Sequence, residues 1–139
     1  MNEKILWAKL RQGMKDKWHA TRHEDILSEG VPDVSYGLDG TNGWIELKCV
    51  DKKPVRGNKK VRVKSLTSAQ VAWITARGKA GGSCWILLAV GSTVFLLSWR
   101  TARAVKQGLS MSDLSLLSAY QTSGPIDWSE LHKVLIKGH

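Results

Sequence analysis

The chain has 139 residues, of which 42% are hydrophobic and 24% charged, and this composition fits one globular domain over residues 1–139. Its longest apolar run, residues 85–90, is much shorter than the roughly 20 residues that cross a bilayer. The first residues also lack the apolar stretch of a secretory signal, so we expect a cytoplasmic protein that does not enter a membrane.

Basic residues outnumber acidic residues by 21 to 12, which gives a net charge of +9. Such an excess in a small domain predicts a polyanionic partner, with nucleic acid as the first candidate and an acidic membrane surface as the second. The two cysteines, Cys49 and Cys84, lie far apart in the sequence and lack a zinc-site spacing, so we expect both to be reduced.

The first half of the chain predicts a helix followed by strands. Apolar residues at helical spacing predict a helix over residues 3–18, and the polar stretch after it predicts a short strand and a loop. Two strands follow, over residues 31–36 and 44–50. Turn-forming residues separate them, and among these Asn42-Gly43 is a typical hairpin signal.

The second half begins with a basic stretch, residues 52–64, which holds seven basic residues and no acidic one. Its proline and glycine predict an exposed loop. A helix capped by Ser65 or Thr67 then runs to about Arg77, before strands over residues 84–90 and 93–99. Short helices are predicted near residues 101–107, 112–120 and 127–137. This order of elements indicates an α/β or α+β domain, a sheet flanked by helices.

The residues with the clearest chemistry are Asp33, after Pro32, and Glu46 and Lys48 on the following strand. Side chains alternate along a strand, so Glu46 and Lys48 share one face and their apolar neighbours face the core. A charged pair on an otherwise apolar strand is unfavourable unless it is paired or binds a ligand. The hairpin brings Asp33 toward Glu46.

Two adjacent carboxylates repel each other, and a divalent cation relieves that repulsion. Magnesium prefers oxygen ligands, and a bound metal can generate a hydroxide and stabilise charge on a phosphate. Lys48 can orient or deprotonate the water, or stabilise the transition state. These groups are the ones that phosphodiester hydrolysis needs.

The stretch GVPDVSYGLDGTNGWIELK, residues 30–48, resembles the signature of the PD-(D/E)XK nuclease superfamily. The resemblance covers roughly residues 1–90. It implies a restriction-endonuclease-like α/β core, in which a central mixed sheet is flanked by helices in the order α-β-β-β-α-β. It also implies that Asp33 and Glu46 are metal ligands, that the Leu47 carbonyl is a further ligand, and that Lys48 is the signature lysine.

The resemblance implies two more site residues. Many members complete the metal site with an upstream acid, for which Glu24 and Glu3 are the candidates. We favour Glu24, because TRHEDILSEGVPD is similar to small phage nuclease-like proteins. Gln70 matches a glutamine that lies near the active site in resolvase-like and VRR-NUC-like members.

The basic stretch is expected to contact the DNA backbone, which positions a substrate without reading its sequence. The residues assigned to this role are Lys52, Lys53, Arg56, Lys59, Lys60, Arg62 and Lys64.

Together these features predict an endonuclease that uses Mg²⁺, replaceable by Mn²⁺, and no organic cofactor. By resemblance we expect a homodimer that cuts branched DNA, as a Holliday junction resolvase does, in the cytoplasm of a bacterium or of a phage-infected host. Two alternatives stay open: a general or sequence-specific DNA nuclease of the same superfamily, and a basic nucleic-acid-binding module without catalysis.

Overall fold

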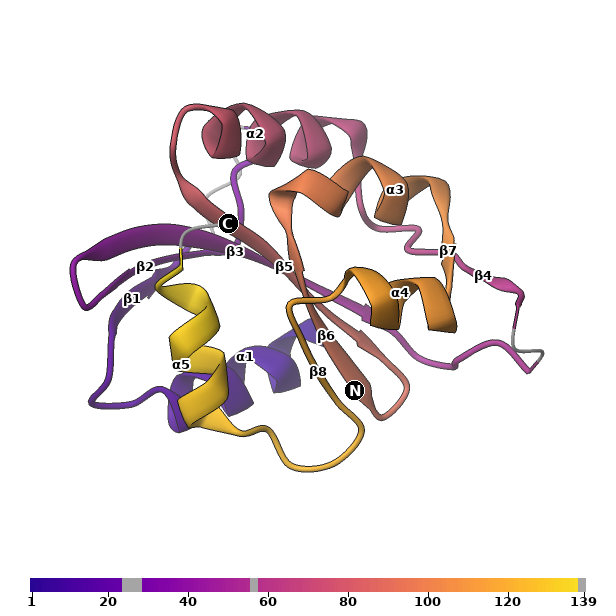
Figure 1. Ribbon diagram of the computed structural model, residues 1–139, viewed down its shortest axis with the longest axis horizontal. Coiled ribbons are helices and arrows are strands. Elements are labelled where there is room, and N and C mark those ends of the chain that lie inside the picture. Colours follow the sequence, from indigo (N-terminus) through magenta and orange to yellow (C-terminus); the bar gives the residue numbers. More distant parts are fainter. Residues whose placement is uncertain (24–28, 56–57, 138–139) are drawn as a thin grey trace.

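The computed structural model describes residues 1–23, 29–55 and 58–137, which form a central sheet between two layers of helices (Figure 1). The elements in chain order are α1 Glu3–Gly13, β1 His19–Arg22, β2 Val34–Leu38, β3 Thr41–Val50, β4 Lys60–Val61, α2 Ser68–Lys79, β5 Ser83–Val90, β6 Thr93–Ser98, the short 3-10 helix η1 Trp99–Thr101, α3 Ala102–Gln107, β7 Leu109–Ser110, α4 Met111–Leu117, β8 Tyr120–Thr122 and α5 Trp128–Leu135.

The central sheet has six strands in the order β1-β2-β3-β5-β6-β8. All neighbouring strands are antiparallel except β3 and β5, which are parallel and are joined by a crossover through α2. A separate two-stranded sheet pairs β4 with β7. The predicted α/β class, with a mixed sheet flanked by helices, is therefore confirmed.

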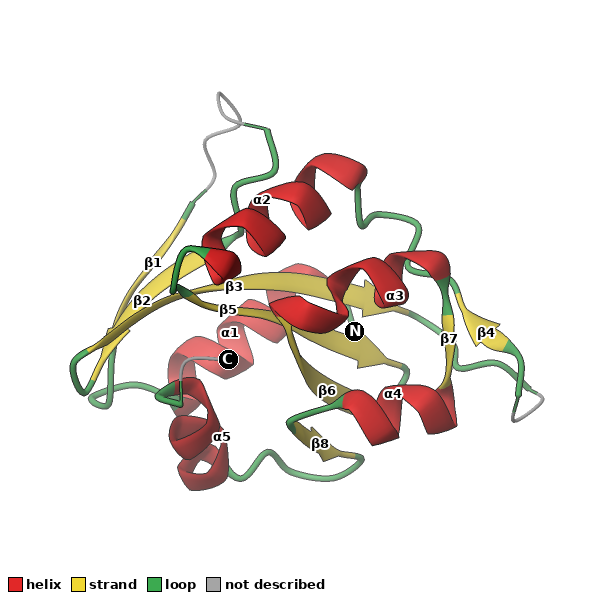
Figure 2. Ribbon diagram, turned by 45° about the horizontal axis from the view of Figure 1, so that its top comes forward, coloured by secondary structure: helices red, strands yellow, loops and turns green. Residues whose placement is uncertain are grey.

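Helices cover both faces of the central sheet (Figure 2). One apolar core lies between the sheet and α1 and α5, and the other between the sheet and α2, α3 and α4. Every residue of β5 is buried, which explains why its sequence after Ser83 is a continuous apolar run and does not alternate. No helix in the described ranges has the length and hydropathy of a membrane-crossing segment.

The turn between β2 and β3 lies three residues earlier than predicted. Leu38 pairs with Thr41, so the two-residue loop is Asp39-Gly40 and not Asn42-Gly43. Both loop residues have positive φ, 47° at Asp39 and 82° at Gly40, as a type I′ hairpin requires. The Asp-Gly pair satisfies this requirement as well as Asn-Gly does, and it leaves Asn42 and Gly43 within β3.

Three further predictions of element bounds were wrong. The first helix ends at Gly13, where the backbone packs against the Trp128 ring, and not at residue 18. The basic stretch is not wholly an exposed loop, because β4 pairs with β7 and buries Val61. The helix predicted over residues 112–120 ends at Leu117, and the chain then forms β8 along the edge of β6.

Gly78, in the last turn of α2, permits a close contact with Trp99, and this contact gives a test of the packing. A β-carbon added at Gly78 would lie 2.1 Å from Trp99 Cδ2. Gly78→Ala should therefore lower the free energy of unfolding by about 1–3 kcal/mol, although alanine favours helices. Urea denaturation measures the change.

Gly124→Ala is the matched control, because a β-carbon there meets nothing within 4 Å. We expect no loss of stability in this variant. Equal stability of the two variants would contradict the packing described for α2.

Candidate active site

Asp33 lies where β2 begins, and its side chain continues the bonding between β2 and β3. The register of the two strands ends at the pair of Val34 and Ile45. Beyond that pair, Asp33 Oδ2 accepts a hydrogen bond from the Leu47 N–H at 2.8 Å. The Asp33 carbonyl accepts one from the His23 N–H at 2.6 Å. Asp33 is therefore held from both neighbouring strands, beside Glu46.

Glu46 and Lys48 project from the face of β3 that α2 covers, and both are buried, with 2% and 3% of their surfaces exposed. Ile45 and Leu47 point to the opposite face, into the core formed with α1 and α5, as the predicted alternation requires. Lys48 Nζ lies 3.3 Å from Glu46 Oε2 and donates to the Ser65 carbonyl at 2.8 Å. The lysine thus links β3 to the segment that precedes α2.

The electrostatics of the site disfavour a charged Glu46. Burial and the negative charge of Asp33 together raise the pKa of Glu46 from 4.5 to about 8, although the positive charge of Lys48 lowers it. Glu46 Oε1 is buried and has no hydrogen-bond partner among the described residues. Lys48 pairs with Glu46, and no ion pair of the described residues includes Asp33, so an added cation would stabilise the two carboxylates in their ionised form.

The oxygen atoms at this place suit a hard divalent cation. Glu46 Oε1 lacks a hydrogen-bond partner within the described part of the chain, and Asp33 supplies a second carboxylate. The N–H and C=O of one strand residue point to the same side of the strand, so the Leu47 carbonyl is also directed to the side of Asp33. Within residues 1–23, 29–55 and 58–137, no group of three or more acidic, histidine or cysteine residues is gathered for a metal.

Of the two candidates for the upstream acid, the structure describes only Glu3. Glu24 lies outside the described residues, so its role stays a prediction. Glu3 is in the first turn of α1. Burial, and after it the charge of Glu3, raises the pKa of Cys49, which lies on the face of β3 opposite to Glu46. The structure thus does not bring Glu3 together with Asp33 and Glu46.

Gln70 lies in the first turn of α2, where its side chain caps the helix. Its side-chain Oε1 accepts from the Thr67 N–H at 2.9 Å, and its own N–H donates to Thr67 Oγ1 at 3.1 Å. This reciprocal pair is a capping box, which fixes the start of α2. The expected cap at Thr67 is confirmed, and a role of Gln70 in catalysis stays a prediction.

Gly30 brings the segment before Asp33 close to the start of α2. Its φ is +82°, and a β-carbon there would lie 2.4 Å from the Ala69 carbonyl oxygen. Only glycine combines this conformation with so close an approach. The contact places Asp33 and the α2 N-terminus on two sides of the same site.

A cluster of aromatic rings from the end of β1, from β3 and from α2 lies on the face of the sheet that carries Glu46. The His23 and Trp44 rings lie 5.2 Å apart, Trp44 and Trp73 lie 5.0 Å apart, and the Arg77 guanidinium lies 4.5 Å from the Trp73 ring. Trp44 and Arg77 line an open groove of about 420 Å³ with Ser35. Sequence reasoning missed this cluster. The signal was Trp44, which alternation places on the face of Glu46.

The basic residues assigned to DNA contact are exposed where the structure describes them. Arg56 lies outside the described residues. The others are all exposed, and they are Lys52, Lys53, Lys59, Lys60, Arg62 and Lys64. Arg62 Nη1 also donates to the Gln107 carbonyl at 3.5 Å, a contact that joins the stretch to the end of α3.

The raised pKa of Glu46 predicts how stability changes with pH. Between its unfolded value near 4.5 and its folded value of about 8, the folded protein binds a proton that the unfolded chain has released. Stability of the metal-free protein should therefore fall as pH rises through this window. From about pH 5.5 to about pH 7.5, we expect a loss of ~2 kcal/mol relative to Glu46→Gln.

Urea unfolding in EDTA at the two pH values, for both proteins, measures this difference. Glu46→Gln keeps the shape of the side chain and cannot ionise, so other titrating groups cancel in the comparison. Parallel pH profiles for the two proteins would show that Glu46 is not forced into its neutral form.

No protein-family model matches the sequence, and a search of curated proteins finds no match. Among solved structures, the chain is similar to Archaeoglobus fulgidus Hjc, described as a Holliday junction resolvase from an archaeal hyperthermophile. The similarity covers 81% of this chain and 96% of that chain, with 15% sequence identity and a TM-score of 0.45.

Proposed function

We propose that this protein is a metal-dependent endonuclease that hydrolyses phosphodiester bonds in DNA. The observation that carries the proposal is the arrangement of the half-buried Asp33 with the buried Glu46 and Lys48, in which Glu46 Oε1 has no hydrogen-bond partner among the described residues. A buried, unpaired carboxylate oxygen is unfavourable, and a cation there removes the penalty. The net charge of +9 supports a polyanionic substrate.

In this proposal, Asp33, Glu46 and the Leu47 carbonyl hold Mg²⁺, and Mn²⁺ can replace it. The bound ion supplies an activated water and stabilises negative charge on the phosphate. Lys48 is fixed by Glu46 and by the Ser65 carbonyl, so its ammonium stays beside the carboxylates. There it can orient the attacking water or stabilise the charge that develops on the phosphate oxygens.

The finer parts of the proposal extend the resemblance of residues 30–48 to the PD-(D/E)XK signature. We propose branched DNA as the substrate, a homodimer as the active form, and Glu24 as the acid that completes the metal site. The exposed basic residues from Lys52 to Lys64 contact the DNA backbone. These contacts would fix where the substrate lies without selecting its sequence.

The direct test is cleavage of end-labelled DNA in the form of a four-way junction, a flap and a linear duplex. With Mg²⁺ we expect paired symmetric cuts in the junction. EDTA should abolish them, and Glu46→Ala should reduce the rate by at least about 100-fold, because the loss of a transition-state charge contact has this magnitude.

Asp51→Ala is the matched control, since it removes an exposed carboxylate just beyond β3 and should leave the rate unchanged. Cleavage of all three substrates would indicate a general nuclease. Tight binding without cleavage in Mg²⁺ or Mn²⁺ would contradict the enzyme and leave a binding module.

A second prediction concerns metal binding without DNA. A cation that binds the folded site stabilises the protein by mass action, by about 2.7 kcal/mol at a concentration 100 times its Kd. Mn²⁺ or Mg²⁺ should therefore raise the melting temperature of the unaltered chain, and more strongly as pH rises toward 8, where Glu46 ionises more readily.

Differential scanning calorimetry with and without EDTA measures this shift, and Glu46→Gln should lack it. The same shift in both proteins would place the cation elsewhere.

A further inference from the structure

The positive charge of the chain is concentrated in one continuous segment. Residues 52–112 contain twelve basic residues and no acidic one, while the rest of the chain contains nine basic and twelve acidic residues. The net charge of +9 therefore comes entirely from this segment. The basic stretch supplies seven of the twelve, and α2, η1 and α3 supply the other five, so the charge extends well beyond the stretch.

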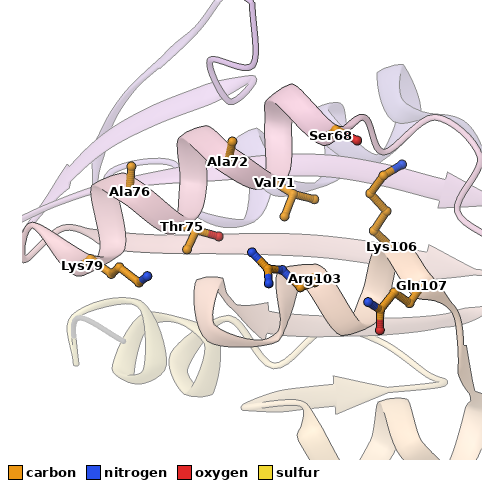
Figure 3. Close-up of a pocket in the computed structure, with 9 residues that line it drawn as sticks. All are labelled: Ser68, Val71, Ala72, Thr75, Ala76, Lys79, Arg103, Lys106 and Gln107. Atoms are coloured by element: carbon orange, nitrogen blue, oxygen red, sulfur yellow. The ribbon is translucent and has the colours of Figure 1, made fainter.

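Three of these five cations line a groove of about 740 Å³ between α2 and α3 (Figure 3). Lys79 lies at one end of the groove, Lys106 at the other, and the Arg103 guanidinium extends into the space between the helices. The remaining lining residues are small, apolar or neutral polar: Ser68, Val71, Ala72, Thr75, Ala76 and Gln107. In the part of the chain that the structure describes, none of the three cations pairs with a carboxylate.

The groove begins beside the candidate active site. Lys106 Nζ donates to the Leu66 carbonyl at 2.9 Å, and Lys48 Nζ donates to the preceding carbonyl, that of Ser65, at 2.8 Å. From Ser68 to Lys79 the groove follows α2 for about 16 Å, at 1.5 Å per residue. This length matches the rise of about five nucleotides at 3.4 Å each.

Structural roles account for only part of this arrangement. Lys79 is in the last turn of α2, where a cation stabilises the helix dipole, and Lys106 satisfies the Leu66 carbonyl. Arg103 lies within α3, and it has neither a side-chain hydrogen bond nor a carboxylate partner among the described residues. An exposed helix face usually carries both signs of charge, but α2 and α3 carry only one.

We propose that the α2–α3 groove binds the sugar–phosphate backbone of a DNA strand as it leaves the cleavage site. The inference rests on the proposed function. The three cations would neutralise phosphates, and Ser68 and Thr75 offer hydroxyl groups to phosphate oxygens. The small side chains Ala72 and Ala76 let the backbone approach the helix. Recognition of this kind does not depend on the base sequence.

The test compares two double variants in DNA binding without metal. Lys79→Gln with Arg103→Gln removes two of the three exposed groove cations and keeps Lys106, whose bond to Leu66 supports the active-site segment. Lys9→Gln with Arg11→Gln removes two exposed cations from α1, on the opposite face of the sheet, and Arg11 is likewise in the last helical turn. Thermal melts check that both variants fold.

Fluorescence anisotropy with EDTA, over a salt series, gives the dependence of log K on log salt for duplexes of two unrelated sequences. Each lost phosphate contact should reduce the magnitude of this slope by about 0.9, so the slope of the groove variant should be smaller by about 2. Its affinity should fall by the same factor for both sequences. The α1 variant should keep the slope of the unaltered chain.

An unchanged slope in the groove variant would overturn the inference and leave the endonuclease proposal, which depends on cleavage. The opposite result also distinguishes the two proposals. A reduced slope in a protein that never cleaves DNA would support DNA binding by the groove and contradict the endonuclease proposal. If the groove variant instead loses binding only to phosphatidylserine vesicles, the groove serves a membrane surface and the inference is wrong.

Discussion

The hydrogen bond from the Leu47 N–H to the Asp33 carboxylate is the interaction on which the site depends. Pairing between β2 and β3 ends at Val34 and Ile45, so the edge of β3 beyond that pair needs another acceptor. Asp33 supplies one with its side chain. The same bond holds the carboxylate next to Glu46, and a carboxylate that satisfies a buried backbone donor is fixed in position. The hydrogen bond that extends the pairing of β2 with β3 therefore also positions the Asp33 carboxylate in the site.

The burial of Glu46 and Lys48 lowers the stability of the fold, whereas the Asp33 hydrogen bond supports it. Two ionisable groups occupy positions on β3 whose neighbours in β5, Ile86 and Leu88, are entirely buried. Apolar side chains there would extend the core. A protein keeps such groups where a ligand or a reaction needs them, and folds that break a local rule in this way usually do so at functional sites. This cost is largest at Glu46 Oε1, which is buried and has no hydrogen-bond partner in the ranges that the structure describes.

The site could be predicted from the sequence because its geometry is local. Alternation along β3 determines which side chains share a face, and a hairpin brings Asp33 to Glu46 whichever two residues form the turn. Asp39-Gly40 and Asn42-Gly43 both fit a tight turn, and the sequence alone does not rank them. A helix cap at Ser65 or Thr67 could likewise be predicted, and the structure places it at Thr67, because the cap involves residues only three positions apart.

Non-local contacts were not predictable in this way. Lys60 and Val61 form a strand only because Leu109 and Ser110 come alongside, about fifty residues later in the chain. The bonds of Lys48 to Ser65 and of Lys106 to Leu66 depend on the crossover through α2 and the return of α3. Their side chains gave no signal of these carbonyl partners, which depend on the position of the backbone.

The distribution of charge differs between the helices on the two faces of the sheet. The α1 and α5 side mixes acidic and basic residues around an apolar core, whereas α2 and α3 contain no acidic residue. Repulsion among the basic side chains of residues 52–112 destabilises the fold slightly, and nothing in the packing of the apolar core requires it. Asp33, Glu46 and Lys48 lie under that same face. A negatively charged ligand drawn to it would therefore arrive at the two carboxylates, where only a bound cation makes close approach favourable.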